Sequence, residues 1–239
     1  MTIHNRKQKT LTLFSLCSLL AFSACTIDAY EKGEGEYSLT TAELVEAHVG
    51  SDKKVDYVMT DQGERLLMQP SVTAKWIETA DTTYRALMYY NIVREGAAEA
   101  VSMGRVGVLI PRSLSSREGS SSAGSGEVKM KTDPLYLESS WLGKNRRYLN
   151  LRLRLLTGST TDEDAVHTIG LVHDSLASTP THARLKLYHD QGGQPEYYSV
   201  VTYASIPLYM LNADTLTLEV NTYDGMVERT FVCTPKTGE

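Results

Sequence analysis

The sequence has 239 residues, of which 41% are hydrophobic and 22% are charged, and its formal net charge is −5. This acidic balance disfavours nucleic acid and other polyanions as partners, because they require a basic surface. The length allows two modest domains or one large all-β domain.

The N-terminal segment has the organisation of a secretory signal. Arg6, Lys7 and Lys9 form a positively charged region before an apolar run that begins at Leu11. This run of about 14 residues is shorter than the ~20 that a bilayer-spanning helix needs. Small residues then precede Cys25. The pattern therefore predicts export rather than a membrane span.

The segment Phe22-Ser23-Ala24-Cys25 resembles the lipobox of bacterial lipoproteins, with phenylalanine where leucine is usual. The resemblance implies that residues 1–24 are a signal peptide and that Cys25 is acylated and becomes the first residue of the mature chain. An ordinary signal peptide with a nearby cleavage site is the alternative.

Processing changes the composition of the chain. The signal carries three bases and no acids, so its removal takes the net charge from −5 to −8. Cys17 leaves with the signal and Cys25 would carry lipid, which leaves Cys233 without an intramolecular disulfide partner. We therefore expect a fold that rests on buried apolar area. Residues 25–36 are polar and acidic and suit a tether behind the lipid.

Residues 37–112 predict a small β-barrel. Turn signals separate five runs of strand character, which are Tyr37–Val49, Val55–Thr60, Arg65–Met68, Tyr84–Arg94 and Glu99–Ile110. Five strands in a domain of this length are typical of an OB-like five-stranded barrel.

One of these runs is apolar on both faces. A strand with one solvated face should alternate between apolar and polar residues, but Tyr84–Val93 does not. Something therefore covers its outer face. We favour the irregular segment 69–83, with Trp76 and Ile77, as the cover. Docking of the second domain or of a partner is the alternative.

Residues 113–131 predict a flexible linker, because 113–127 contain ten Ser or Gly among fifteen residues. Such a linker would let the two halves move independently. Residues 132–236 follow with about seven evenly spaced strands, which are typical of an immunoglobulin-like β-sandwich. The expected fold class is therefore all-β, with a barrel followed by a sandwich.

Four segments of the second domain resemble one family. They read HTIGLV (His167–Val172), LYHDQGGQPEYY (Leu187–Tyr198), YASIPL (Tyr203–Leu208) and TLTLEVNTYDG (Thr215–Gly225). They look like the C-terminal domain of NigD-like lipoproteins from Bacteroidetes.

This resemblance implies a lipoprotein signal, an N-terminal OB-like domain and a C-terminal β-sandwich. It also implies residence in the cell envelope, as an outer-membrane lipoprotein that faces the periplasm or is displayed on the surface. The family takes its name from a bacteriocin-associated operon and supplies no catalytic residues.

Motifs for catalysis, metals and cofactors are missing from the sequence. HExxH, GxxxxGK[ST], GxGxxG and GxSxG do not occur. His167 and His173 lie ~20 Å apart along one expected strand and cannot share an ion. We therefore expect no catalytic residues, no metal and no cofactor.

A cationic patch is the best candidate for a binding site. It comprises Lys144, Arg146, Arg147, Arg152 and Arg154, beside Trp141 and Tyr148. Arginine pairs with carboxylate or phosphate and stacks on aromatic rings, so the patch could meet an anionic glycan or a lipid head group. Charges that keep edge strands from aggregating are the simpler and favoured explanation.

The expected function is a non-enzymatic binding or accessory module. Its partners would be the membrane, through the lipid, and an unknown protein or glycan. Residues 34–112 carry twelve acids and eight bases, so the barrel is not expected to bind nucleic acid. The alternative is an enzyme, such as a hydrolase of envelope glycans, whose site is not visible in the sequence.

Overall fold

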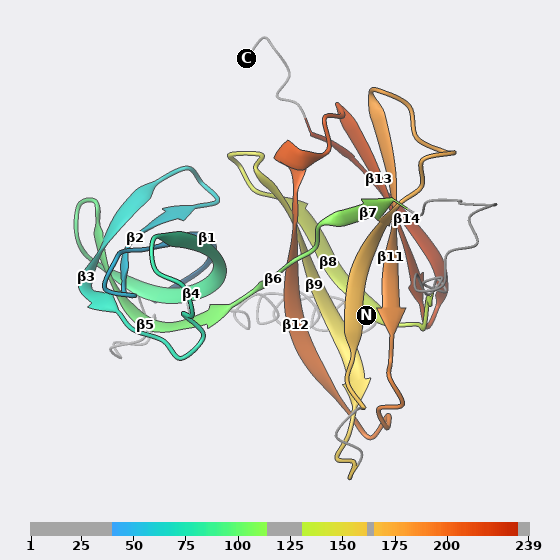
Figure 1. Cartoon of the computed structure of the whole chain (residues 1–239), viewed down its shortest axis with the longest axis horizontal. Coiled ribbons are helices and arrows are strands. Elements are labelled where there is room, and N and C mark those ends of the chain that lie inside the picture. Colours follow the sequence, from blue (N-terminus) through green and yellow to red (C-terminus); the bar gives the residue numbers. More distant parts are fainter. Residues whose placement is uncertain (1–39, 114–130, 162–164, 234–239) are drawn as a thin grey trace, which may run out of the picture. The chain divides into compact units, whose positions relative to one another are not determined.

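The computed structural model describes residues 40–113, 131–161 and 165–233. Within these ranges the chain forms β-strands and one short 3-10 helix (Figure 1). The expected all-β class, a five-stranded barrel followed by a β-sandwich, is confirmed. The signal peptide, Cys25 and the tether lie outside the described residues. Among the described residues, no helix is long and apolar enough to cross a membrane.

The first domain is a closed five-stranded barrel with the strand order β1-β2-β3-β5-β4. Its strands are β1 (Thr41–Val49), β2 (Val55–Thr60), β3 (Arg65–Val72), β4 (Thr82–Arg94) and β5 (Ala97–Arg105). The β3–β5 pair is parallel, and antiparallel pairing of β1 with β4 closes the barrel. This is the arrangement expected of an OB-like barrel.

The second domain consists of two sheets. The five-stranded sheet has the order β14-β13-β11-β10-β7 and the four-stranded sheet has the order β6-β12-β9-β8. The strands are β6 (Gly107–Val108), β7 (Pro111–Ser113), β8 (Tyr136–Leu142), β9 (Tyr148–Thr157), β10 (Thr168–His173), β11 (His182–Asp190), β12 (Tyr198–Pro207), β13 (Thr215–Thr222) and β14 (Gly225–Val232). The 3-10 helix η1 (Leu208–Met210) follows β12. The strands after residue 131 number seven in the described part of the chain, as expected.

Alternation along β9 explains how the sheets pack. Leu149, Leu151 and Leu153 are fully buried in the sandwich core, whereas Arg152 between them is exposed. Each buried leucine contributes about 1.5–3 kcal/mol relative to an exposed one. The same alternation places Asn150, Arg152 and Arg154 of β9 on the outer face of the four-stranded sheet.

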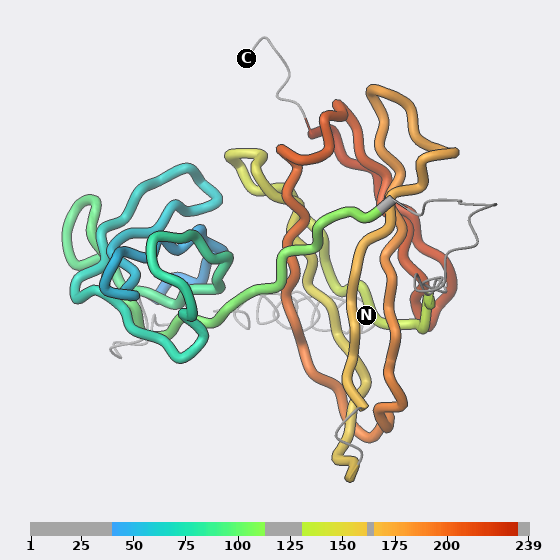
Figure 2. The backbone as a smooth tube through the Cα atoms, in the orientation of Figure 1, coloured from blue at the N-terminus to red at the C-terminus, as the bar shows by residue number. Residues whose placement is uncertain are grey.

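The passage from barrel to sandwich lies earlier than the expected boundary at residue 112. The expected strand Glu99–Ile110 divides, because β5 ends at Arg105 and β6 pairs with β12 of the sandwich. β7 then pairs with β10. Leu109 explains the change, since its side chain is buried in the sandwich core. Figure 2 shows this green segment entering the sandwich. Residues 114–130 of the expected linker lie outside the described residues.

Candidate functional site

The outer face of β4 meets the sandwich, which corrects the cover that the sequence favoured. Trp76 and Ile77 of the segment 69–83 pack against the barrel core instead. The reason is the alternation of side chains along β4, since the face that Trp76 and Ile77 cap is the inner one. Leu87 and Tyr89 point to the other face and line a groove with side chains of the sandwich. The alternative, docking of the second domain, is therefore the arrangement found.

A buried polar network lies at the centre of the junction between barrel and sandwich. Arg85 of β4 donates from Nη2 to Asp61 Oδ2 at 2.6 Å and to Asn150 Oδ1 at 3.0 Å. Its Nε donates to Ser205 Oγ at 3.1 Å. Asn150 Nδ2 also donates to Asp61 Oδ2, at 2.6 Å. The side chains of Arg85 and Asp61 are only 1% and 7% exposed, so each charge depends on these partners rather than on water.

A second contact joins β1 to the start of β9. The hydroxyl of Tyr148 donates to Glu46 Oε1 at 2.8 Å, and Arg147 Nη2 donates to the same oxygen at 3.0 Å. Burial is the main cause that raises the pKa of Tyr148, so its hydroxyl keeps the proton that it donates. The hydrogen bond to Glu46 raises the pKa of Arg147. Glu46 is thus held by two donors from the sandwich.

The turn between β8 and β9 is hydrogen-bonded to the turn between β2 and β3. Asn145 donates from its backbone N–H to the carbonyl of Asp61 at 2.9 Å and from Nδ2 to the carbonyl of Thr60 at 3.1 Å. Gly143 permits this approach, because a Cβ at that position would lie 3.1 Å from Asp61 Cγ. The loop that carries the expected cationic patch therefore serves as a connector between the domains.

A groove of about 320 Å³ lies beside this network and is called here the interdomain groove. Both domains contribute to its walls. The barrel supplies Glu43, Asp61, Gln62 and Tyr89, and the sandwich supplies Trp141, Lys144, Arg152 and Tyr203, among others. Grooves of this size with aromatic walls and a few polar groups, placed between domains, are typical of ligand sites.

The structure divides the expected cationic patch into separate groups. Trp141, Lys144 and Arg152 line the interdomain groove. Arg147 and Tyr148 hold Glu46 in the junction. The two remaining members do neither. They are Arg146, which donates to the carbonyl of Val232, and Arg154, whose guanidinium lies 3.7 Å from the centre of the Tyr136 ring.

The two walls of the groove differ in charge. On the sandwich wall, Glu138 is shared by Arg152 at 3.2 Å and Arg154 at 2.9 Å. Lys144 has no ion-pair partner in the part of the chain that the structure describes. On the barrel wall, burial raises the pKa of Glu43. The sandwich wall is therefore net positive.

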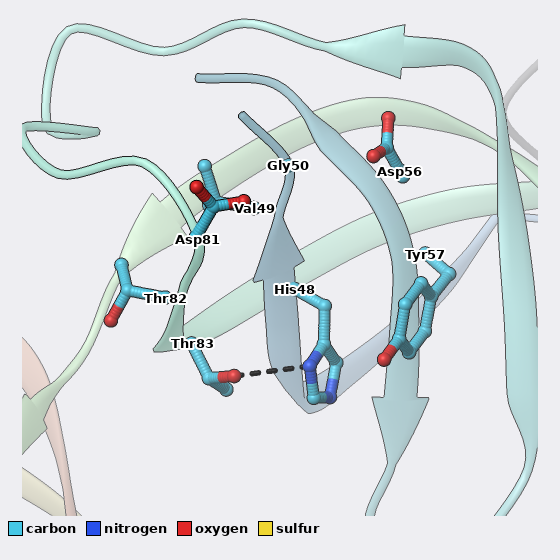
Figure 3. Close-up of a pocket in the computed structure, with 8 residues that line it drawn as sticks. All are labelled: His48, Val49, Gly50, Asp56, Tyr57, Asp81, Thr82 and Thr83. Atoms are coloured by element: carbon cyan, nitrogen blue, oxygen red, sulfur yellow. Dashed lines mark hydrogen bonds between the residues drawn. The ribbon is translucent and has the colours of Figure 1, made fainter. Parts of the chain in front are cut away.

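A second, smaller hollow of about 190 Å³ lies on the barrel (Figure 3). The rings of His48 and Tyr57 stack there with centroids 4.3 Å apart, and Thr83 Oγ1 lies 3.0 Å from His48 Nδ1. Burial lowers the pKa of His48, which keeps the imidazole neutral at pH 7. Asp56 and Asp81 also line the hollow. Its charge is therefore negative.

Metal ligands do not gather in the described ranges, where no group of three or more His, Cys, Asp or Glu side chains could hold an ion. His167 does meet another histidine, but it is His189 of β11 rather than His173. His167 Nδ1 lies 3.1 Å from His189 Nε2, and His189 Nδ1 lies 2.9 Å from the carbonyl oxygen of Asp133. The two rings thus form a hydrogen-bonded stack.

The sequence did not reveal the residues at the centre of the junction. Arg85 lies 24 residues from Asp61, 65 from Asn150 and 120 from Ser205. No local pattern connects positions so far apart. One signal was present, since Arg85 is a charged residue within an apolar strand, and such a residue requires a buried partner.

Comparisons with known proteins agree with this architecture. Residues 120–233 match the family model of the NigD-like C-terminal beta sandwich domain. A comparison with curated proteins gave no significant match.

Solved structures with the same fold come from Bacteroides and Parabacteroides species. A NigD-like immunity protein from Bacteroides caccae is 24% identical, with a TM-score of 0.59 over 81% of this chain and 97% of that one. A candidate toxin-related protein from Parabacteroides distasonis is 17% identical, with a TM-score of 0.59 over 80% and 92% of the two chains. A candidate lipoprotein from Bacteroides fragilis is 13% identical, with a TM-score of 0.51 over 82% and 99%. The second domain of this chain is therefore a NigD-like C-terminal β-sandwich domain.

Proposed function

We propose that this protein is a non-enzymatic binding module of the cell envelope. An acylated Cys25 would hold it at the outer membrane, and the interdomain groove would be its ligand site. Its partners are then the membrane, through the lipid, and a protein or glycan in the groove. Nucleic acid is an unsuitable partner for a mature chain of net charge −8.

The composition of the groove carries this proposal. Aromatic side chains and a few charged groups converge from two domains, and the buried network beside them fixes the domains in place. A site built in this way loses little conformational freedom when a ligand binds. The likeness to a candidate lipoprotein of Bacteroides fragilis supports the anchoring. The name of the Bacteroides caccae relative, an immunity protein, is compatible with a binding role.

Anchoring is tested by cell fractionation of the full chain. Cys25→Ser should move the protein from the membrane fraction to the soluble fraction, because acyl chains on that residue provide the stable anchor. Cys17→Ser is the matched control, since it lies in the apolar run, and it should leave the protein in membranes. If the Cys25→Ser protein still partitions with the membranes, the lipid anchor is not at Cys25.

Binding is tested by hydrogen exchange of the full chain in detergent, with and without an extract of its own cell envelope. We expect slower exchange in peptides that cover Glu43, Gln62 and Trp141, because an occupied groove reduces local opening. Trp141→Ala should abolish this protection. Unchanged exchange around the groove would contradict the proposed site.

A hydrolase of envelope glycans is the alternative, and one observation favours it. Glu43 and Asp61 line the same groove, and burial raises the pKa of Glu43 as it does in general acids. Against it, Asp61 Oδ2 is already held by Arg85 and Asn150. Release of reducing sugar from envelope glycans, abolished by Glu43→Gln, would establish the hydrolase.

A further inference from the structure

We propose that the interdomain groove binds an acidic saccharide, that is, a sugar ring that carries a carboxylate or a phosphate. This inference rests on the proposed function and names the ligand class of the same site. It follows from three features of the groove: its aromatic surfaces, its acceptors on the barrel wall and its cations on the sandwich wall.

The aromatic surfaces suit a sugar ring. Trp141 and Tyr89 line the groove and remain 37% and 41% exposed, and Tyr203 lies there with them. A sugar ring has an apolar C–H face and a polar edge of hydroxyls. Flat aromatic side chains offer a large rigid apolar surface to such a face, while their own polar atoms stay at the rim.

The barrel wall supplies acceptors for hydroxyls. Asp61 is only 5% exposed, and its Oδ1 has no hydrogen-bond partner among the described residues, although its Oδ2 accepts from Arg85 and Asn150. Buried polar atoms are normally paired with protein or ordered water. Because this oxygen is itself buried, a hydroxyl in the groove would satisfy it through a bridging water. Glu43 and Gln62 line the same wall.

The sandwich wall supplies the charge that selects an acidic ligand. Within the described residues, Glu138 pairs with both Arg152 and Arg154, and Lys144 has no ion-pair partner. Arg152 meets Glu138 through its Nε atom, which lies 3.2 Å from Glu138 Oε2. Its terminal nitrogens and the ammonium of Lys144 therefore remain for an anion, with which they form the stronger, charge-assisted kind of hydrogen bond.

The opposed walls determine the orientation of the ligand. An acidic group next to Lys144 and Arg152 places the hydroxyl edge of the same ring toward Glu43 and Asp61. A neutral sugar would lack the first contact, and a small anion would lack the aromatic and hydroxyl contacts. The groove thus requires both properties in one molecule.

Calorimetry on the full chain in detergent tests this inference. The probes are trigalacturonic acid for the carboxylate and mannose 6-phosphate for the phosphate, with maltotriose and citrate as the neutral sugar and the anion without a ring. We expect binding of at least one acidic sugar, and at least tenfold weaker binding of maltotriose and citrate. The acidic sugar that binds identifies the anionic group.

Paired variants locate the binding. Lys144→Glu should weaken binding of the acidic sugar about tenfold or more, since a charge-assisted hydrogen bond contributes about that factor. Trp141→Ala should also weaken this binding, because it removes the aromatic surface that the sugar ring would contact. The matched controls are Tyr197→Ala, an aromatic that is 80% exposed outside the groove, and Lys75→Glu, an exposed lysine of the barrel. Equal losses in variants and controls would overturn the site.

The two proposals fail in different ways. If an envelope extract protects the groove from hydrogen exchange but neither acidic sugar binds, the ligand class is wrong and the binding function stands. If maltotriose or citrate binds as tightly as the acidic sugars, the ligand class is also wrong. If nothing protects the groove, the proposed function fails as well.

Discussion

Arg85 of the barrel donates from Nη2 to Asn150 Oδ1 of the sandwich at 3.0 Å, although the two residues lie 65 positions apart in the chain. Both side chains are buried, with residue exposures of 4% and 0%. A buried charge that depends on a partner in another domain couples the stability of the two domains. This contact argues against independent movement of the two halves.

Arg85→Ala should destabilise the protein by about 3–5 kcal/mol, because it leaves the carboxylate of Asp61 buried without its cation. Urea unfolding should also change from one transition to two, since the barrel and the sandwich lose their shared contact. Lys54→Ala is the control. Lys54 pairs with Asp52 at the surface, where solvent screens the pair, so we expect a far smaller loss of stability. A loss below about 1 kcal/mol in Arg85→Ala would contradict the coupling.

The sandwich core gives a second prediction. Leu151 is fully buried between the sheets, whereas Leu176 is 94% exposed. Leu151→Ala removes buried methyl groups and leaves a cavity, which should cost about 2–5 kcal/mol in the free energy of unfolding. The same substitution at Leu176 should stay within about 0.5 kcal/mol. Similar losses at the two positions would mean that β9 does not lie in the core.

Local patterns were sufficient to predict most strands. Alternating leucines in Tyr148–Leu155 predicted β9, and the pair Asp224-Gly225 predicted the turn before β14, where Gly225 has φ +109°. Such signals lie within a few residues of one another. They are therefore readable from a single sequence.

Contacts between distant segments were not predictable in this way. The sequence placed Lys144 to Arg154 in one patch because they are neighbours in the chain, but the partners of these side chains come from β1, β8 and the end of β14. The apolar outer face of β4 signalled that a cover exists. The segment that covers this face is determined by the contacts between the turn at 143–147 and the barrel. The periodicity of the sequence does not indicate these contacts.

The stacked histidines predict a loss of stability in mild acid. Burial, and to a smaller extent the charge of His189, lowers the pKa of His167 below its ordinary value of 6.5. The unfolded chain therefore takes up a proton on this residue at a higher pH than the folded chain does. The stability that neutral His167 contributes is complete above about pH 6.5 and is lost as the pH falls toward its folded-state pKa.

Measuring the melting temperature between about pH 7.5 and pH 5 checks this loss of stability. These two pH values lie about one to two units on either side of the ordinary histidine pKa. His167→Gln should flatten the fall of the melting temperature on acidification. His173→Gln, which removes another histidine of the sandwich, should leave that fall in place. An unchanged pH dependence in His167→Gln would assign the effect to other groups.

Alanine substitutions at two adjacent glycines can distinguish the effect of backbone strain from that of a steric clash. Gly192 and Gly193 both have positive φ, +62° and +76°, in the turn after β11. A Cβ at Gly193 would meet no atom within 4 Å, but one at Gly192 would overlap the backbone carbonyl of Val166. Gly193→Ala should therefore lower the free energy of unfolding by about 1–2 kcal/mol, because alanine is strained in the left-handed conformation. Gly192→Ala introduces the same strain and must also displace the backbone at Val166. The free energy of unfolding should therefore fall further in this variant. Urea unfolding of the two variants measures the difference, and equal losses would show that the turn does not pack against Val166.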